Sequence, residues 1–165
     1  MGKTGGASST PAGVAKLQNL AVTFNRAGLQ AQVVDEIESV LWRKLAVNVG
    51  INALTAILGV PNGELLRIND CASLINGAVR EAVEVAGHCG IQLKLQEEIE
   101  RVRAVCRSTT ANISSMLQDV RRKRKTEIDQ LNGAVVKMAA SYGTTAPVNE
   151  ILTAIVRSLE TVYIR

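Results

Sequence analysis

Apolar residues recur at helical spacing along most of the chain, and this pattern predicts a mainly α protein. In residues 13–27 they lie three or four positions apart, so we expect a helix that ends at Gly28. Residues 29–34 instead predict a short strand. The same spacing, interrupted by glycine and proline, predicts further helices over residues 35–58, 71–87, 93–106, 108–121, 126–142 and 147–163. The expected fold is a multi-helix domain preceded by a short helix-strand segment.

The start of the helix at residues 126–142 is predicted from a capping pattern. The Thr126 hydroxyl can accept a hydrogen bond from a free backbone amide, and the acidic Asp129 follows three residues later. Residues 1–12 are rich in glycine, serine, threonine and proline and have no periodicity, so we expect a flexible lead there.

One predicted helix carries a row of polar side chains in an otherwise apolar sequence. Within residues 41–58, Lys44, Asn48 and Asn52 lie four positions apart, and Thr55 follows after three. Residues at this spacing share one face of a helix. Because nearly all other positions of the segment are apolar, we expect the helix to be buried on most sides, and the row then needs polar partners.

This row has two interpretations, and the residues alone leave both open. Its side chains form hydrogen bonds to neighbouring helices, or they line a polar cleft in which Lys44 meets an oxygen of a substrate. In the second case a partly desolvated lysine can exchange a proton near neutral pH, while carboxamides orient hydroxyl or carboxylate groups without adding charge.

The composition limits the chain to one ordinary domain. Of its 165 residues, 47% are hydrophobic and 21% are charged, so the chain should fold but cannot hold a second full domain. Its few aromatic residues provide no stacking platform for single-stranded nucleic acid. With no signal segment and no apolar stretch of membrane-spanning length, we expect a soluble protein without membrane contact, most simply in the cytoplasm.

The formal net charge of +4 comes from one local run. Residues 121–125 carry five consecutive positive charges, and without them the net charge would be −1. We expect this run to form a solvated turn. The alternatives are a local role near an anionic cofactor or substrate, and nucleic-acid binding, which the lack of aromatic residues and of a recognition-helix pattern disfavours.

The cysteines and the single histidine do not predict a metal site or a nucleophile. Cys71, Cys89 and Cys106 are odd in number and widely spaced, and only His88 is available to assist them. We therefore expect no bound metal, cysteines that serve as small buried apolar residues, and a structural histidine.

Five blocks of the sequence follow one another in a specific order. They are Leu-Trp-Arg-Lys-Leu-Ala-Val-Asn at 41–48, Ile-Asn-Ala-Leu-Thr-Ala at 51–56, Pro-Asn-Gly-Glu-Leu at 61–65, Asn-Ile-Ser-Ser-Met-Leu-Gln-Asp at 112–119 and Thr-Glu-Ile-Asp-Gln-Leu-Asn-Gly at 126–133. In this order they resemble the helical C-terminal domain of the ketopantoate reductases (2-dehydropantoate 2-reductases). The resemblance covers about residues 13–165. It implies a fold like the C-terminal domain of 6-phosphogluconate dehydrogenase-like reductases.

The resemblance also implies a reaction, the NADPH-dependent reduction of a small 2-keto acid, ketopantoate, to pantoate in pantothenate biosynthesis. By position, Lys44 is implied to be the catalytic lysine that donates a proton to the ketone oxygen. Glu127 is implied to be the acid that positions Lys44 and reaches the cofactor. On its own, Glu127 would be interpreted as an acid in the first turn of a helix.

The substrate-binding residues are likewise implied by the resemblance. Asn48 and Asn52 would bind the substrate hydroxyl, and Ser115, with Asn112 beside it, would bind the carboxylate. Without the resemblance, Ser114 and Ser115 are ordinary helix serines.

The chain departs from the family at its N-terminal end, where no Gly-x-Gly-x-x-Gly follows a strand. We therefore expect residues 1–34 to hold the flexible lead and the terminal helix and strand of a missing dinucleotide-binding domain, and residues 35–165 to form the helical substrate-binding and catalytic domain. NADP would be bound mainly by the missing Rossmann domain, so we expect a fragment that is inactive alone. The alternative functions are a helical oligomerisation or interaction module without catalysis, whose exposed apolar surface promotes homo-oligomers, and a basic nucleic-acid-binding protein.

Overall fold

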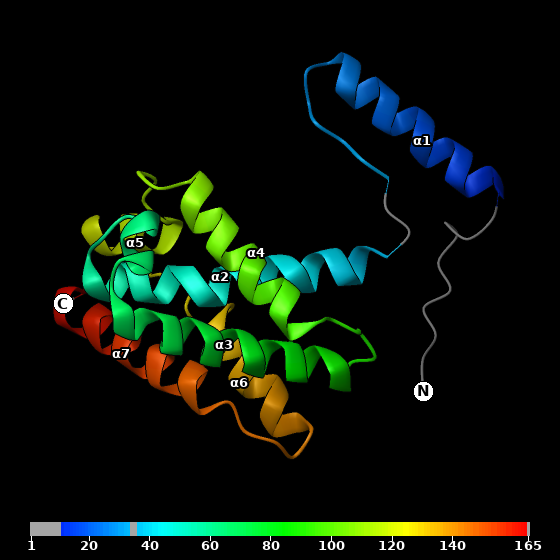
Figure 1. Cartoon of the computed structure of the whole chain (residues 1–165). Helices are drawn as coiled ribbons and strands as arrows, with labels where there is room; N and C mark the ends of the chain where they lie inside the picture. The colour runs from blue at the N-terminus through cyan, green and yellow to red at the C-terminus, as the bar shows by residue number, and fades with distance from the viewer. Residues whose placement is uncertain (1–10, 34–35, 165) are drawn as a thin grey trace. The chain divides into compact units, whose positions relative to one another are not determined.

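The computed structural model describes residues 11–33 and 36–164, and every regular element in these ranges is a helix. The mainly α prediction is therefore confirmed. The elements are α1 (Pro11–Arg26), α2 (Ile37–Leu58), the 3-10 helix η2 (Asn62–Leu66), α3 (Asn69–His88), α4 (Leu95–Ser108), α5 (Ser115–Arg121), α6 (Asn132–Ser141) and α7 (Pro147–Tyr163) (Figure 1). The chain divides into two compact units, and the second unit begins at Glu38.

The first unit contains α1, which ends as predicted because Gly28 follows it with a left-handed φ of +80°. The predicted strand is wrong for residues 29–33, which have no strand, while residue 34 lies outside the described residues. Instead, Asn25 Nδ2 donates to the Ala31 carbonyl at 2.8 Å, and the Ala31 amide donates to Asn25 Oδ1 at 3.0 Å. With no partner strand in the described part of the chain, the segment after α1 closes back onto the helix. The flexible lead predicted at residues 1–12 falls outside the described residues up to residue 10, and residues 11 and 12 belong to α1.

The second unit is built on α2, whose residues 49–56 are buried without interruption. A helix that is apolar on all sides is expected to be covered on all sides. At Gly50, an added Cβ would lie 3.2 Å from side-chain atoms of both Val79 and Val102, so α3 and α4 pack closely against this point of α2. Val135 of α6 and Val156 of α7 are also fully buried, and together these helices form one aliphatic core.

The helix predicted at residues 108–121 ends as predicted, since α5 ends at Arg121, but its predicted start is wrong, because α4 ends at Ser108 and α5 begins only at Ser115. The Thr109 and Thr110 hydroxyls donate to backbone carbonyls of the last turn of α4, which competes with continuing the helix. Ser114 then caps α5, with its Oγ accepting from the Leu117 amide at 3.1 Å. Residues 109–114 thus form a loop between two short helices.

The start predicted for the helix at residues 126–142 is also wrong, since α6 begins at Asn132. Thr126 Oγ1 does accept a backbone amide, from Ile128 at 3.2 Å, but it donates its own proton to Glu160 of α7. Asp129 binds Arg157 of α7 and does not close a capping box. Contacts with α7 therefore hold residues 126–131 in an irregular turn.

The other predicted helices are confirmed, with bounds shifted by one or two residues at most termini. α2 ends before Gly59, which has a left-handed φ of +71°, and α7 begins at Pro147. Among the described helices, none combines the length and the apolar content that crossing a membrane would require.

Candidate active site

The polar row of α2 runs from the protein surface into the interior. Lys44 is exposed, Asn48 is half-buried, Asn52 is 8% exposed and Thr55 is fully buried. The spacing of four residues predicted one shared helix face, and the change in burial gives that face a direction. The row therefore has a solvent end at Lys44 and an inner end at Thr55.

The inner end of the row meets α5 through a buried pair of hydroxyls. Thr55 Oγ1 lies 2.7 Å from Ser114 Oγ, and it also lies within 3.1 Å of the Ile51 and Asn52 carbonyls. A consistent assignment has Ser114 donating to Thr55, while Thr55 donates to the α2 backbone. This contact brings Ser115, the first residue of α5, beside the inner end of the row.

Asn112 is held near the same place by contacts between two loops. Its carbonyl accepts from the Asn62 amide at 3.0 Å, and the Gly63 amide donates to the Thr110 carbonyl at 3.1 Å. An added Cβ at Gly63 would lie 2.5 Å from Thr110, so only glycine permits this approach. The side chain of Asn112 is exposed.

Glu127 lies on the irregular turn before α6, and its side chain is exposed. Its carbonyl accepts from the Gln130 and Leu131 amides, both at 3.1 Å. At the end of the same turn, Asn132 Nδ2 donates to the Val49 carbonyl of α2 at 3.2 Å. The turn is thus joined to α2 at the position between Asn48 and Asn52, although no hydrogen bond or ion pair links Glu127 to Lys44 within the described residues.

The six side chains singled out from the sequence share one property. Within residues 11–33 and 36–164, none of them makes a hydrogen bond or ion pair through its side chain. The six are Lys44, Asn48, Asn52, Asn112, Ser115 and Glu127. Polar neighbours that build the site do have side-chain partners: Thr55, Ser114 and Thr126 are bonded through their hydroxyls, and Asn132 is bonded through Nδ2, although its buried Oδ1 has no partner. The side-chain amide of Asn52 is not among the fully buried polar groups that lack a partner. It therefore keeps some contact with solvent.

The hydrogen-bonding interpretation of the polar row holds at Thr55, which bonds to Ser114 at the start of α5. Lys44, Asn48 and Asn52 make no side-chain hydrogen bond to a neighbouring helix among the described residues. Polar groups with unused donors and acceptors can bind a polar ligand without first breaking internal hydrogen bonds. The expected desolvation of Lys44 is not provided by the described residues, because its side chain is exposed.

The basic run at residues 121–125 is exposed throughout, in agreement with a solvated turn. Arg121 Nη2 donates to the Gly59 carbonyl at 3.3 Å, which ties the run to the C-terminal end of α2. Lys123 adopts a left-handed φ of 54°, and this residue ends α5 in a tight turn. The run lies in sequence directly before the turn that carries Glu127.

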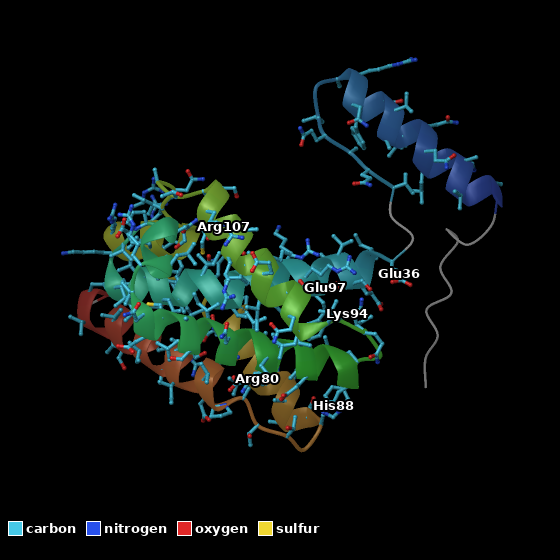
Figure 2. The ribbon with its side chains drawn as sticks, in the orientation of Figure 1. Glu36, Arg80, His88, Lys94, Glu97 and Arg107 are labelled. Carbon is cyan, nitrogen blue, oxygen red and sulfur yellow. The ribbon has the colours of Figure 1, made fainter. Side chains whose placement is uncertain are left out.

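His88 ends α3 (Figure 2) and stacks on Tyr142, with ring centroids 5.3 Å apart. Cys89 Sγ lies 3.6 Å from the Tyr142 hydroxyl, and this contact raises the pKa of Tyr142. Cys71 and Cys106 are buried as predicted, and burial raises the pKa of both thiols, whereas Cys89 is only half-buried. No group of metal-ligating residues occurs in the described part of the chain.

Some residues that build the site were not predicted. Without the resemblance the sequence predicts an ordinary helix serine at Ser114, although a serine three residues before an amide that it can cap is a recognised start signal. Glu160 follows Leu152 and Val156 at intervals of four on the buried face of α7. A carboxylate in an apolar row is a signal for a buried polar contact.

Comparisons with known proteins identify relatives over most of the chain. The family model described as "Ketopantoate reductase PanE/ApbA C terminal" matches residues 36–160. The 2-dehydropantoate 2-reductase of Pyrobaculum aerophilum is 37% identical over 144 residues, which are 87% of this chain and 51% of that protein. This chain thus spans about half the length of the curated relatives it matches.

Two solved structures are similar in fold. A PanE/ApbA family ketopantoate reductase from Ralstonia eutropha matches with a TM-score of 0.84 and 32% identity, over 90% of this chain and 49% of that one. A D-mandelate dehydrogenase, in a ternary structure with NADH and anilino(oxo)acetate, matches with a TM-score of 0.88 and 29% identity. This second match covers 95% of this chain and 65% of that one.

Proposed function

The chain belongs to the ketopantoate reductase family, and we propose that it forms the substrate-binding half of an NADPH-dependent reductase that converts ketopantoate to pantoate. The observation that carries this proposal is that six polar side chains, none with a partner among the described residues, lie on α2, on the first turn of α5 and the loop before it, and on the turn before α6. Two contacts join these elements, Thr55 to Ser114 and Asn132 to the Val49 carbonyl. Among these six, Asn52 is buried and Asn48 is half-buried, and buried polar groups are ordinarily hydrogen-bonded, so the unused donors and acceptors of these two side chains support a bound ligand.

Lys44 is the proposed proton donor. Reduction of a ketone places negative charge on its oxygen, and an ammonium nearby stabilises that charge more than it stabilises the neutral ketone. The exposed position of Lys44 supports this role, because a second domain that closes over it would remove water from the ammonium and the substrate. Glu127 is proposed to orient the Lys44 ammonium in the closed enzyme.

The remaining residues are proposed to hold the substrate. Asn48 and Asn52 offer donors and acceptors to the hydroxyl of ketopantoate, and the burial of Asn52 favours a fixed position for that group. Ser115 and the exposed Asn112 offer donors to the carboxylate near the N-terminal end of α5. The fixed Thr55 to Ser114 contact supports a constant distance between these two sets.

The described residues fit the substrate side of such a site and not the dinucleotide side. They contain no strand, so they cannot form the strand-turn-helix that cradles a pyrophosphate. A nicotinamide cofactor, when bound, supplies the hydride for the reduction. We assign its binding mainly to a dinucleotide-binding domain, of which α1 would be the last helix, and Glu127 is the residue of this chain proposed to reach it.

Exposed apolar residues on α7 support the proposal that this chain also associates with copies of itself. Ile151, Ile155 and Val162 lie on α7 and are 59%, 40% and 71% exposed. Single exposed apolar side chains are common, but three at helical spacing form a stripe that a second copy could cover. We propose homo-oligomers on this basis.

The proposed function is tested by supplying the dinucleotide-binding part. The chain alone, and the chain joined to or mixed with the dinucleotide-binding domain of a relative, are assayed for oxidation of NADPH that depends on ketopantoate. We expect turnover only when both parts are present. Turnover at full rate by this chain alone would contradict the division of the site between two parts, and no turnover by any combination would contradict the reductase assignment.

A further inference from the structure

The turn that carries Glu127 has little regular structure of its own. Residues 126–131 precede α6 and contain no regular helix. Contacts within the turn are short-range, with the Glu127 carbonyl accepting two amides from the residues that follow it. A stable position for Glu127 therefore depends on contacts from elsewhere in the fold.

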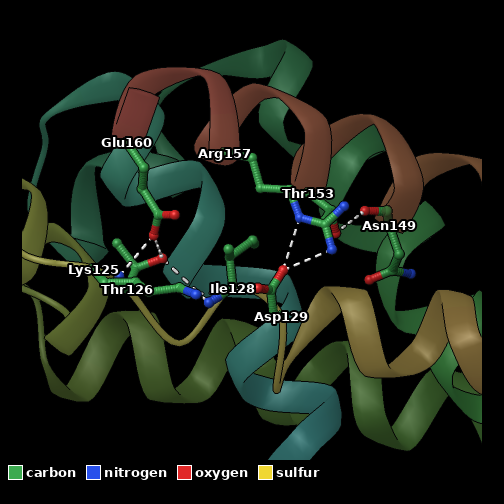
Figure 3. A network of polar contacts seen from close by, with 8 residues as sticks. All are labelled: Lys125, Thr126, Ile128, Asp129, Asn149, Thr153, Arg157 and Glu160. Carbon is green, nitrogen blue, oxygen red and sulfur yellow. Dashed lines mark hydrogen bonds and ion pairs between the residues drawn. The ribbon is translucent and has the colours of Figure 1, made fainter. Parts of the chain in front are cut away.

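α7 supplies the first of these contacts through Glu160 (Figure 3). Glu160 Oε1 accepts from the Thr126 amide and from Thr126 Oγ1, both at 2.7 Å. Glu160 is 8% exposed and Thr126 is 5% exposed, so both hydrogen bonds are sheltered from water. No cation pairs with Glu160 among the described residues, and Thr126 supplies both hydrogen bonds to its Oε1.

The burial of this carboxylate needs an explanation beyond packing. Glu160 continues the buried row of Leu152 and Val156, where an apolar side chain would fill the space without the cost of desolvating a charge. A carboxylate at this place does what an apolar residue cannot do, since it fixes the backbone of Thr126, the residue next to Glu127.

One turn earlier on α7, Arg157 makes the second contact (Figure 3). Its Nε lies 2.8 Å and its Nη2 2.7 Å from Asp129 Oδ1. The Arg157 side chain is 59% exposed and that of Asp129 is 33% exposed, so water weakens this ion pair more than it weakens the buried contact. Thr126 and Asp129 flank Glu127, and α7 thus holds the turn on both sides of it.

We propose that Glu160, assisted by Arg157, is a positioning residue that holds Glu127 in place for the reductase reaction. The inference rests on the proposed role of Glu127. Glu160 touches neither substrate nor cofactor and acts through Thr126. A displacement of a catalytic group by about 1 Å can lower a rate about a hundredfold, so a clamp on the neighbouring backbone matters for chemistry.

Hydrogen exchange on the full chain tests the clamp without any assay of activity. Glu160→Ala removes the oxygen that accepts both hydrogen bonds, whereas Glu160→Gln keeps an oxygen that can accept from Thr126. The exposed Glu150, on the first turn of the same helix, gives the control Glu150→Ala. We expect Glu160→Ala to accelerate exchange of the Ile128, Gln130 and Leu131 amides about tenfold or more, with exchange in α2 unchanged.

The other variants are expected to distinguish a local effect on the turn from a loss of stability of the whole fold. Glu160→Gln should recover most of the protection of the turn, and Glu150→Ala should leave it unchanged. Asp129→Asn, at the more exposed contact, should give a smaller local acceleration of exchange, and it replaces Glu160→Ala as the test variant if Glu160→Ala does not fold. Equal acceleration of exchange in α2 and in the turn would overturn the proposal. No acceleration in Glu160→Ala or in Asp129→Asn would overturn it as well.

Kinetics of the assembled reductase then test the link to Glu127. We expect Glu160→Ala to lower kcat about tenfold with little change in KM for ketopantoate, and Glu160→Gln to restore kcat. An unchanged kcat in Glu160→Ala, despite faster exchange in the turn, would overturn the positioning role. If the unaltered assembled protein shows no reductase activity, the proposed function fails, while the exchange measurements still decide whether α7 clamps the turn.

Discussion

Ser114 Oγ lies 2.7 Å from Thr55 Oγ1, and this buried contact joins the start of α5 to the inner end of the polar row on α2. The next residue, Ser115, is exposed, and its side chain has no partner within the described residues. Two adjacent serines therefore have different environments, one buried inside the structure and one exposed at the surface. This difference can be measured.

Ser114→Ala should destabilise the fold, and Ser115→Ala should not. Removing Ser114 Oγ deletes both the cap of α5 and the contact with Thr55, which together should lower the free energy of unfolding by about 1 to 3 kcal/mol. Ser115→Ala should change it by less than about 0.5 kcal/mol. Urea unfolding of the full chain measures both values. Equal destabilisation by the two variants would contradict the different environments of the two serines.

Glu81 should be important for stability because it caps α7 from α3. Its Oε1 accepts from the Val148 amide at 2.8 Å, and its Oε2 accepts from the backbone and side-chain amides of Asn149 at 2.9 and 2.7 Å. Glu81→Ala leaves the backbone amides of Val148 and Asn149 unpaired, while Asn149 Nδ2 keeps its bond to the Ala78 carbonyl, and should lower the free energy of unfolding by about 2 to 4 kcal/mol. The exposed Glu84 on the same helix gives the control Glu84→Ala, for which a loss of similar size would count against this account.

The pKa of Tyr163 should report the charge of Glu160. Burial raises the pKa of Tyr163, and the negative charges of Glu160 and Asp119 raise it further. Glu160→Gln should therefore lower this pKa toward that of free tyrosine. Absorbance titration of tyrosinate in a Tyr142→Phe background isolates the signal. An unchanged pKa in Glu160→Gln would show that Glu160 carries no charge next to Tyr163.

The same pKa predicts how stability changes at high pH. The unfolded chain loses the Tyr163 proton at a lower pH than the folded protein does, so it binds fewer protons in that range. Folding stability should therefore fall as the pH rises past about 10, the ordinary pKa of tyrosine. In Glu160→Gln this decrease should be smaller, which unfolding midpoints measured across the alkaline range would reveal.

Sequence periodicity predicted the helices but not all of their ends. The glycines after α1 and α2, and Pro147 as the first residue of α7, act locally, and these helix ends are predicted correctly. The turn at residues 126–131 was interpreted as helix because its local pattern is helical. Its actual shape is set by Glu160 and Arg157, which lie about thirty residues later in the sequence, and such long-range contacts are not visible in a local pattern.

The candidate site was predictable in two different ways. The row of Lys44, Asn48 and Asn52 follows from helical spacing alone. Ser115, Asn112 and Glu127 were expected only from the resemblance to a family. What joins the two sets is tertiary structure, namely the Thr55 to Ser114 contact and the Asn132 amide on the α2 backbone.

Lys44 is the residue whose removal bears most directly on the proposed chemistry. The measurement is kcat for ketopantoate reduction by the chain joined to a dinucleotide-binding domain, with Lys44→Ala compared with Lys94→Ala. Lys94 is exposed, as Lys44 is, and it pairs with Glu97 at the start of α4 (Figure 2). Loss of a general acid should lower kcat about a hundredfold or more in Lys44→Ala and leave it unchanged in Lys94→Ala. An unchanged kcat in Lys44→Ala would contradict the proposed role of the polar row.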